Sequence, residues 1–135
     1  MADGTYQTKV YTKQGGDELH VAAGGKIQHE GQVSVTQSTS IATAVTANAL
    51  SGQITTVSQT IAAGAEATFV VNNSLVEATD VVVVCIATHT SAGNFEASVR
   101  AVAAGQFTIQ LTNLDASVAG NNVLVLNFHV IKTKA

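Results

Sequence analysis

The fold is decided by residues 80–89, which read Asp-Val-Val-Val-Val-Cys-Ile-Ala-Thr-His. Seven consecutive apolar residues, Val81 to Ala87, follow the aspartate, and most of them are β-branched. A run of this length and chemistry between turn residues predicts a β-strand that is buried on both faces. Cys85 lies inside the run, so we expect it to be a small buried hydrophobic residue. The rest of the chain should be arranged around this strand.

The composition predicts a core and a surface built from small side chains. Of the 135 residues 46% are hydrophobic, but only 4% are aromatic and there is no tryptophan. Charged residues make up 11%, against roughly 25% in an average soluble protein. Thr, Ser, Asn and Gln must therefore cover much of the surface, as is common where identical subunits pack together. The length fits one domain, or one domain with an appended arm.

The distribution of charge and apolar sequence excludes several classes of partner. The net charge is −3, and the basic residues lie near the two ends of the chain, with Arg100 alone between them. Nucleic acid binding needs a concentrated basic face, so we expect none. No apolar stretch approaches the length of a membrane span, and the N-terminus lacks the pattern of a signal peptide. A single cysteine forms no internal disulfide, which suits synthesis in a reducing cytoplasm.

Residues 53–135 predict a β-sandwich. Short alternating strands recur every 10 to 14 residues or so, separated by Gly, Asn and Ser turns, which is typical of an antiparallel sandwich or jelly roll. Phe107, Ile109 and Leu111, for example, alternate with polar residues. In the last strand Leu124, Leu126, Phe128 and Val130 form one apolar face, and Val123, Val125 and Ile131 form a second. That strand is either central in the sandwich or covered on its second face by another subunit.

Residues 1–35 predict a glycine-rich N-terminal arm, and residues 36–52 a linker. Two Gly-Gly pairs, at 15–16 and 24–25, separate very short alternating segments that are too small to make a core alone. Both tyrosines of the chain, Tyr6 and Tyr11, lie in this arm. The segment 36–52 is rich in Thr, Ser and Ala and carries no charge. The β-branched Thr43, Val45 and Thr46 disfavour a helix, so we expect a connector with room for one irregular strand.

No arrangement of residues in the sequence predicts an active site. Cys85 and His89, on one strand, would lie about 13 Å apart, too far to share a metal ion. The other histidines lie in separate segments, the carboxylates are scattered, and no nucleophile motif or phosphate-binding loop is present. We therefore expect no enzyme activity, no metal, no cofactor and no small-molecule substrate.

Two stretches at the ends of the chain resemble a known family. Residues 10–27 read Val-Tyr-Thr-Lys-Gln-Gly-Gly-Asp-Glu-Leu-His-Val-Ala-Ala-Gly-Gly-Lys-Ile. Residues 103–113 read Ala-Ala-Gly-Gln-Phe-Thr-Ile-Gln-Leu-Thr-Asn, and residues 121–128 read Asn-Asn-Val-Leu-Val-Leu-Asn-Phe. Residues 10–27 resemble the opening of small head proteins of tailed bacteriophages. Residues 103–113 and 121–128 together resemble the β-sandwich ending of the same proteins. Such proteins are similar in role to head decoration, or cement, proteins. The middle of the chain has no counterpart in this resemblance.

The resemblance implies a structural protein of the virion. It would bind the major capsid protein on the capsid exterior, often as homotrimers around local three-fold axes, after synthesis in the host cytoplasm. We expect the arm to contact the capsid through Tyr6, Val10, Tyr11, Gln14, Gly15 and Gly16. We expect Val123, Val125 and Ile131 to lie between subunits, because a doubly apolar last strand suits trimer packing.

The alternative function is a carbohydrate-binding or adhesion module of a head or tail fibre. It would use the loops from His89 to Asn94 and from Asn113 to Asn122. Sugar sites usually contain an aromatic platform, and the one ring that adjoins these loops is Phe95. The strand alternation places Phe95 in the core, which counts against this alternative.

Overall fold

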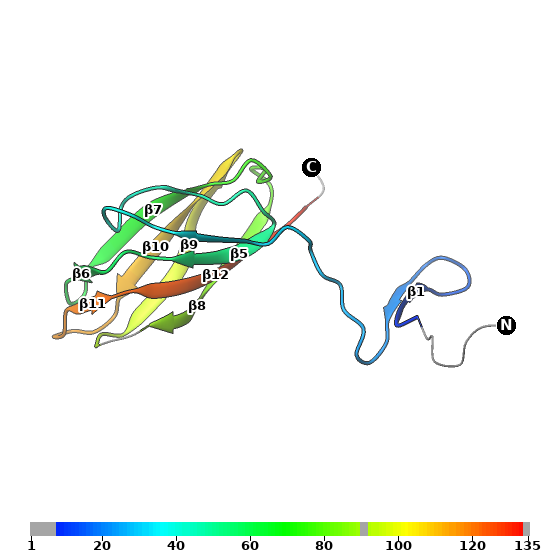
Figure 1. Cartoon of the computed structure of the whole chain (residues 1–135), viewed down its shortest axis with the longest axis horizontal. Coiled ribbons are helices and arrows are strands. Elements are labelled where there is room, and N and C mark those ends of the chain that lie inside the picture. The colour runs from blue at the N-terminus through cyan, green and yellow to red at the C-terminus, as the bar shows by residue number, and fades with distance from the viewer. Residues whose placement is uncertain (1–7, 90–91, 134–135) are drawn as a thin grey trace. The chain divides into compact units, whose positions relative to one another are not determined.

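The computed structural model describes residues 8–89 and 92–133, and every regular element in them is a β-strand (Figure 1). The chain divides into two compact units, Met1–Glu30 and Gly31–Ala135. The all-β fold class predicted from the sequence is confirmed. Among the described residues there is no helix long and apolar enough to span a membrane.

The N-terminal unit contains one hairpin, in which β1 (Val10–Thr12) pairs antiparallel with β2 (Leu19–Val21). The turn between them includes Gly15 and Gly16, whose φ angles of 109° and 79° are rarely adopted by other residues. Tyr6, which we expected to bind the capsid, lies outside the described residues.

The larger unit contains two four-stranded sheets and a two-stranded ribbon. Its strands are β3 (Val33–Thr36), β4 (Val45–Thr46), β5 (Ser51–Thr55), β6 (Gln59–Ile61), β7 (Glu66–Asn72), β8 (Val81–His89), β9 (Phe95–Ala103), β10 (Gln106–Asn113), β11 (Gly120–Asn122) and β12 (Leu124–Ile131). The sheet orders are β4-β7-β10-β9 and β3-β5-β12-β8, and the ribbon is β11-β6. Figure 1 shows β5, β12 and β8 side by side in one layer, with β7, β10 and β9 in the other.

The core lies between the two four-stranded sheets, which is the arrangement of a β-sandwich. The alternating residues of β10 and β12 are buried as the sequence predicts: Phe107, Ile109, Leu111, Leu124, Leu126, Phe128 and Val130. The rings of Phe107 and Phe128 meet across the two sheets with their centroids 5.6 Å apart. Two pairings, β3 with β5 and β4 with β7, are parallel, so the sheets are mixed where the sequence predicted antiparallel ones.

The division of the chain differs from the predicted one. The unit boundary falls after Glu30, and the segment predicted to be a linker, 36–52, belongs to the sandwich. Its buried members are Gln37, Ile41, Val45, Ala47 and Ala49. The side-chain amide of Gln37 donates to the carbonyl oxygens of Ile41 (2.9 Å) and Thr43 (2.7 Å). This side chain satisfies part of the backbone where no regular ladder does. Burial still alternates as in a strand from Val45 to Ala49, but two of the buried residues are alanines.

The position of β8 also differs from the predicted one. Among the described strands β8 pairs with β12 alone, so it lies at the edge of its sheet. Val82, Val84 and Ile86 alternate toward the core, whereas Val81, Val83 and Cys85 are exposed on the other face. The predictions that β8 is buried on both faces and that Cys85 is buried are therefore wrong for the single chain. A two-layer sandwich covers one face of each sheet and leaves the other open.

Candidate functional site

The outer face of the β3-β5-β12-β8 sheet carries no Asp, Glu, Lys or Arg side chain. Residues paired across neighbouring strands share a face, and the register aligns Ser34, Gln53, Asn127 and Cys85 in one row across all four strands. We name this surface the charge-free face. Its members are Ser34, Thr36, Ser51, Gln53, Thr55, Val81, Val83, Cys85, Thr88, Val125, Asn127, His129 and Ile131.

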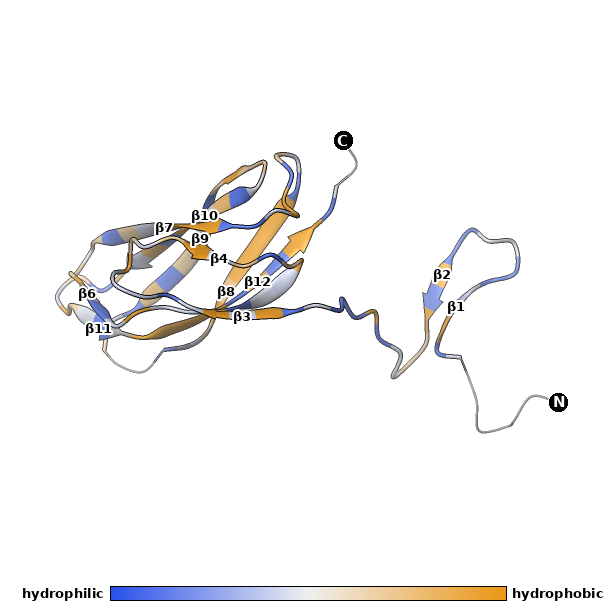
Figure 2. Ribbon diagram, turned by 45° about the horizontal axis from the view of Figure 1, so that its top comes forward, coloured by the Kyte–Doolittle hydropathy of each residue, from blue (hydrophilic) through white to orange (hydrophobic). Residues whose placement is uncertain are grey.

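One corner of the charge-free face is apolar. Val81, opposite Ile131, and Val83, opposite His129, are each 50% exposed, and Ile131 is 47% exposed. Cys85 is exposed beside them. We name Val81, Val83, Cys85 and Ile131 the apolar corner. The hydrophobic run of β8 that supplies three of these residues is visible in Figure 2.

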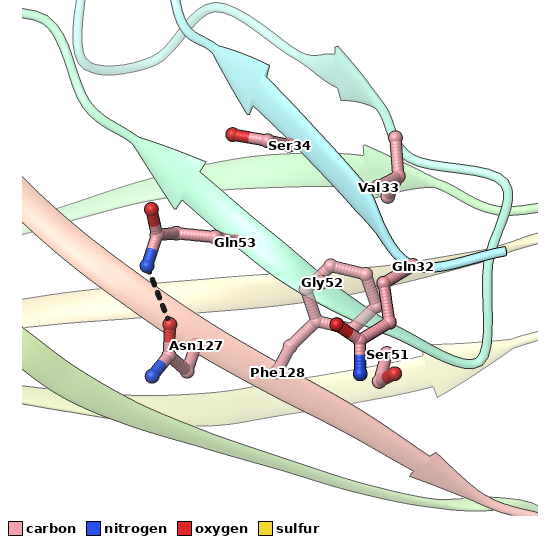
Figure 3. A pocket seen from close by; sticks show the side chains of 8 residues that line it. All are labelled: Gln32, Val33, Ser34, Ser51, Gly52, Gln53, Asn127 and Phe128. Carbon is pink, nitrogen blue, oxygen red and sulfur yellow. Dashed lines mark hydrogen bonds between the residues drawn. The ribbon is translucent and has the colours of Figure 1, made fainter. Parts of the chain in front are cut away.

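The other part of the charge-free face is polar and hollowed. A hollow of about 530 Å³ lies over β3, β5 and β12 and is lined by Gln32, Val33, Ser34, Ser51, Gly52, Gln53, Asn127 and Phe128 (Figure 3). Gln53 and Asn127 point toward one another from neighbouring strands, and the amide of Gln53 donates to Oδ1 of Asn127 at 3.0 Å. Amides and hydroxyls both donate and accept hydrogen bonds, so the hollow suits a neutral polar partner.

Gly52 sets the position of β3 beneath this hollow. A Cβ atom at Gly52 would clash with the carbonyl oxygen of Val33 and would lie 2.9 Å from the ring of Phe128. The missing side chain therefore lets β3 approach β5 closely over the core. This is a requirement for close packing, since Gly52 lies in a strand and has no unusual backbone angle.

The outer face of the opposite sheet has a different chemistry. There β7 and β10 present threonines, glutamines and Val70, and β9 adds Ser98, Ala101 and Ala103. Three residues of this face are charged: Glu66, Glu96 and Arg100. The guanidinium of Arg100 donates to Oε1 of Gln110 at 3.5 Å. A surface of this composition is typical of contact with water. The two outer faces of the sandwich are thus chemically distinct.

The hairpin of the N-terminal unit has two unlike faces. On one face the rings of Tyr11 and His20 lie 5.1 Å apart, and the next pair, Lys13 and Glu18, forms a 2.9 Å ion pair. On the other face Val10 pairs with Val21, beside Leu19, which is 60% exposed. Two of the predicted capsid contacts, Val10 and Tyr11, therefore point in opposite directions. Gln14, Gly15 and Gly16 are exposed at the turn.

The loops considered for carbohydrate binding cover the ring of Phe95 rather than present it. A Cβ atom at Gly93 would lie 2.8 Å from this ring, and one at Gly120 would clash with it. The fully buried Asn113 holds the same region together, since its amide donates to the carbonyl oxygens of Ile61 (3.2 Å) and Val118 (2.9 Å). Residues 90 and 91 of the first loop lie outside the described residues.

Asp80 is a buried carboxylate with a structural role. It accepts hydrogen bonds from Nζ of Lys132 (2.6 Å) and from the backbone N–H groups of Glu77 (2.8 Å) and Thr133 (3.2 Å). The hydrogen bond from Lys132 is the largest cause that lowers the pKa of Asp80, and Asp80 in turn raises the pKa of Lys132. This cluster joins the start of β8 to the end of β12. All its charges are paired with one another, which indicates a structural link.

The described interior gives no sign of a bound ligand. Within residues 8–89 and 92–133, each buried side-chain nitrogen or oxygen has a hydrogen-bond partner. The same residues contain no group of three His, Cys, Asp or Glu side chains placed to hold a metal ion. The surfaces, and in particular the charge-free face and the apolar face of the hairpin, are therefore the candidates for function.

Comparison with known proteins adds no identification. The chain matches no family model, no curated protein and no solved structure. The functional argument therefore depends on the residues themselves.

The predicted subunit contacts are spread along β12 from one end to the other. Val125 and Ile131 are both on the charge-free face, half-buried and exposed respectively, and the half-buried Val123 directly precedes β12. The sequence prediction missed Val81, Val83 and Cys85, which the register places on the same face. The available signal was the doubly apolar pattern of β8, which we assigned to a strand buried on both faces.

Proposed function

We propose that the chain is a structural protein of a tailed-phage virion that binds the outer surface of the capsid. In this proposal the N-terminal unit is a docking arm for the major capsid protein, and the larger unit is a jelly-roll-like body on the capsid exterior. Homotrimers at local three-fold sites form the decorating unit. The resemblance of both chain ends to phage head proteins supports this proposal, as does the chemistry of the two units.

The observation that carries the proposal is the exposed apolar face of the hairpin. Its two strands have three residues each, which is too few for stability without a larger partner surface. Leu19 is 60% exposed and Ile27 is 66% exposed, although both are large hydrophobic residues. A separate unit that leaves such side chains in water is suited to binding another protein.

The hairpin offers two kinds of contact to a capsid. Val10, Leu19 and Val21 supply apolar side chains from one face. The outer edges of β1 and β2, which pair with no other described strand, supply main-chain donors and acceptors for strand addition. We therefore assign the docking contact to the apolar face and the strand edges. Tyr11, on the opposite face against His20, keeps the hairpin folded.

The experiment that tests the proposal is co-sedimentation of the purified chain with mature capsids that lack it. We expect saturation at a fixed ratio near one copy per capsid subunit, and loss of binding on Leu19→Asp. The control is Ser98→Asp, which adds the same charge at an exposed position of β9 and should bind normally. Equal binding by the Leu19→Asp variant and the unmodified chain would contradict the assignment of the hairpin. Absence of binding by the unmodified chain would contradict the function.

A carbohydrate-binding module is the second candidate, and the hollow on the charge-free face favours it. Its amides and hydroxyls match the hydroxyl groups of a neutral sugar. The covered ring of Phe95 removes the aromatic platform from the loops originally considered. Binding on a glycan array that is lost on Gln53→Ala and Asn127→Ala would support this candidate over the first.

A further inference from the structure

The outer face of β8 is apolar in sequence but exposed in the single chain, which is expected only if something covers it. The run Val81–Ala87 has the composition of a strand buried on both faces. In the single chain, Val81 and Val83 are each 50% exposed, and they lie beside Ile131 at 47%. Removal of this apolar corner from water would be favourable. A strand that faced water permanently on this side would not need valine at these positions.

From the composition of the charge-free face we infer that copies of this chain associate with one another through it, with the apolar corner at the centre of the contact. Two identical faces repel when they carry net charge, because like charges are brought together. None of the 13 residues of this face is Asp, Glu, Lys or Arg, although the whole chain carries a formal net charge of −3. The opposite sheet, with Glu66, Glu96 and Arg100, lacks this property.

The polar groups of the charge-free face are compatible with their own copies. The side chains of Gln53, Asn127 and Ser34 each contain donors and acceptors, so each can bond to an identical group. A charged partner would be expected to select complementary charges, and no Asp, Glu, Lys or Arg lies among the members of this face. A second copy of the same face is therefore the occupant that its chemistry fits best.

The size of the face predicts reversible association. Four strands about 4.8 Å apart and seven residues of about 3.3 Å each give a flat area of roughly 450 Å² per copy. Stable complexes bury about 800 Å² per partner, so the contact should be weak when isolated. Assembly should therefore depend on protein concentration. Several copies held close together on a larger lattice would strengthen it through high local concentration.

This inference goes beyond the proposed function: two copies that meet through the same face are related by a two-fold axis and form a dimer, so this contact is separate from the contacts within the proposed trimers. It is tested in solution without capsids, so its failure is distinguishable from failure of capsid binding. A chain that binds capsids but never self-associates would contradict the inference alone. A chain that self-associates but binds no capsid would contradict the function alone.

The first experiment is sedimentation velocity of the full chain over a range of concentrations, with Val83→Glu as the test and Val70→Glu as the matched control. Val70 lies on the outer face of β7 in the opposite sheet, so both variants add one negative charge to a sandwich strand. We expect Val83→Glu to raise the dissociation constant about tenfold or more and Val70→Glu to leave it unchanged. A circular dichroism melt establishes that both variants are folded.

The second measurement uses Cys85, the one cysteine of the chain, as a reporter on the charge-free face. We expect the rate of labelling by a maleimide to fall as the concentration of the unmodified chain rises, because associated copies cover the thiol. In the Val83→Glu variant the labelling rate should not depend on concentration. The two readouts use different atoms of the same face.

Three outcomes would overturn the inference. The first is an unmodified chain that remains monomeric at every concentration. The second is self-association that is equally strong in the Val83→Glu variant. The third is labelling of Cys85 that is independent of concentration but is slowed by added capsids or glycans, which would assign the face to that partner instead.

Discussion

At the scale of single residues, Asp80 joins two strands that are distant in sequence. Its buried carboxylate binds Lys132 and two backbone N–H groups, and thereby fixes the start of β8 to the end of β12. Asn113 has a comparable role at another point of the sandwich, where it joins β6 to the loop before β11. Such side-chain hydrogen bonds stabilise irregular segments that have no backbone hydrogen-bond ladder.

The first prediction concerns the pH dependence of stability. The folded chain lowers the pKa of Asp80 below 3.8, so the stabilisation from Asp80 is complete above that pH and is lost as pH falls through the folded pKa. The folded chain raises the pKa of Lys132 above 10.5, so its contribution is complete below that pH and is lost as pH rises further. Between these limits the contribution of this pair to stability should not change with pH.

Thermal melts of the Asp80→Asn variant test this prediction. We expect a melting temperature a few degrees below that of the unmodified chain at neutral pH, with a smaller decline on acidification below pH 3.8. Glu96→Gln, at an exposed position of β9, is the control and should melt like the unmodified chain. Identical acid profiles for Asp80→Asn and the unmodified chain would contradict the role of Asp80.

At the scale of elements, the strands before β5 are part of the sandwich rather than a connection to it. Val33 and Val35 of β3 pack against the core, and β3 pairs in parallel with β5 over its full length. Gly52 permits this approach, because no side chain separates β5 from the carbonyl oxygen of Val33. The charge-free face therefore includes residues from both ends of the larger unit.

The second prediction is that Gly52→Ala separates β3 from β5. The added methyl group would clash with Val33 and the ring of Phe128, and we expect a loss of about 2 kcal/mol in the free energy of unfolding. Urea denaturation measures the loss. Ser51→Ala, one residue earlier on the outer face, should change the stability little; equal stability of both variants would show that β3 has room to move.

The third prediction separates the two units by truncation. Removal of residues 1–30 should leave the melting temperature of the sandwich unchanged, because the unit boundary follows Glu30. Removal of residues 1–36 also deletes β3 and its two core-facing valines, which we expect to cost at least about 3 kcal/mol. Calorimetry of the two truncated chains makes the comparison. Equal melting temperatures would mean that β3 contributes nothing to the sandwich.

At the scale of the whole molecule, the sandwich has one outer face with charge and one without. The charged face carries Glu66, Glu96 and Arg100, whereas the charge-free face combines an apolar corner with a polar hollow. The sandwich therefore has two unlike outer faces. The charged face is suited to solvent, and the charge-free face is suited to contact with further copies of the chain. An inert virion component would use such a body together with a separate docking hairpin.

The fourth prediction follows from this absence of charge. Association through the charge-free face should change little between low and high sodium chloride, because salt screens interactions between charges and this face has none. Sedimentation velocity at two salt concentrations measures the dissociation constant. A strong weakening at high salt would indicate a contact made by charged residues elsewhere on the molecule.

The sequence by itself determined the fold class and most of the core. Alternation with a period of two marks β10 and β12 directly, because the backbone of a strand sends successive side chains to opposite faces. The tertiary structure alone decided that β8 lies at a sheet edge and that residues 37–49 are part of the sandwich. Periodicity indicates which side chains avoid water. It does not indicate whether these side chains are covered by the same chain or by another copy of it. Val81 and Val83 of β8 are such a case, because their apolar pattern is local but the single chain leaves them 50% exposed.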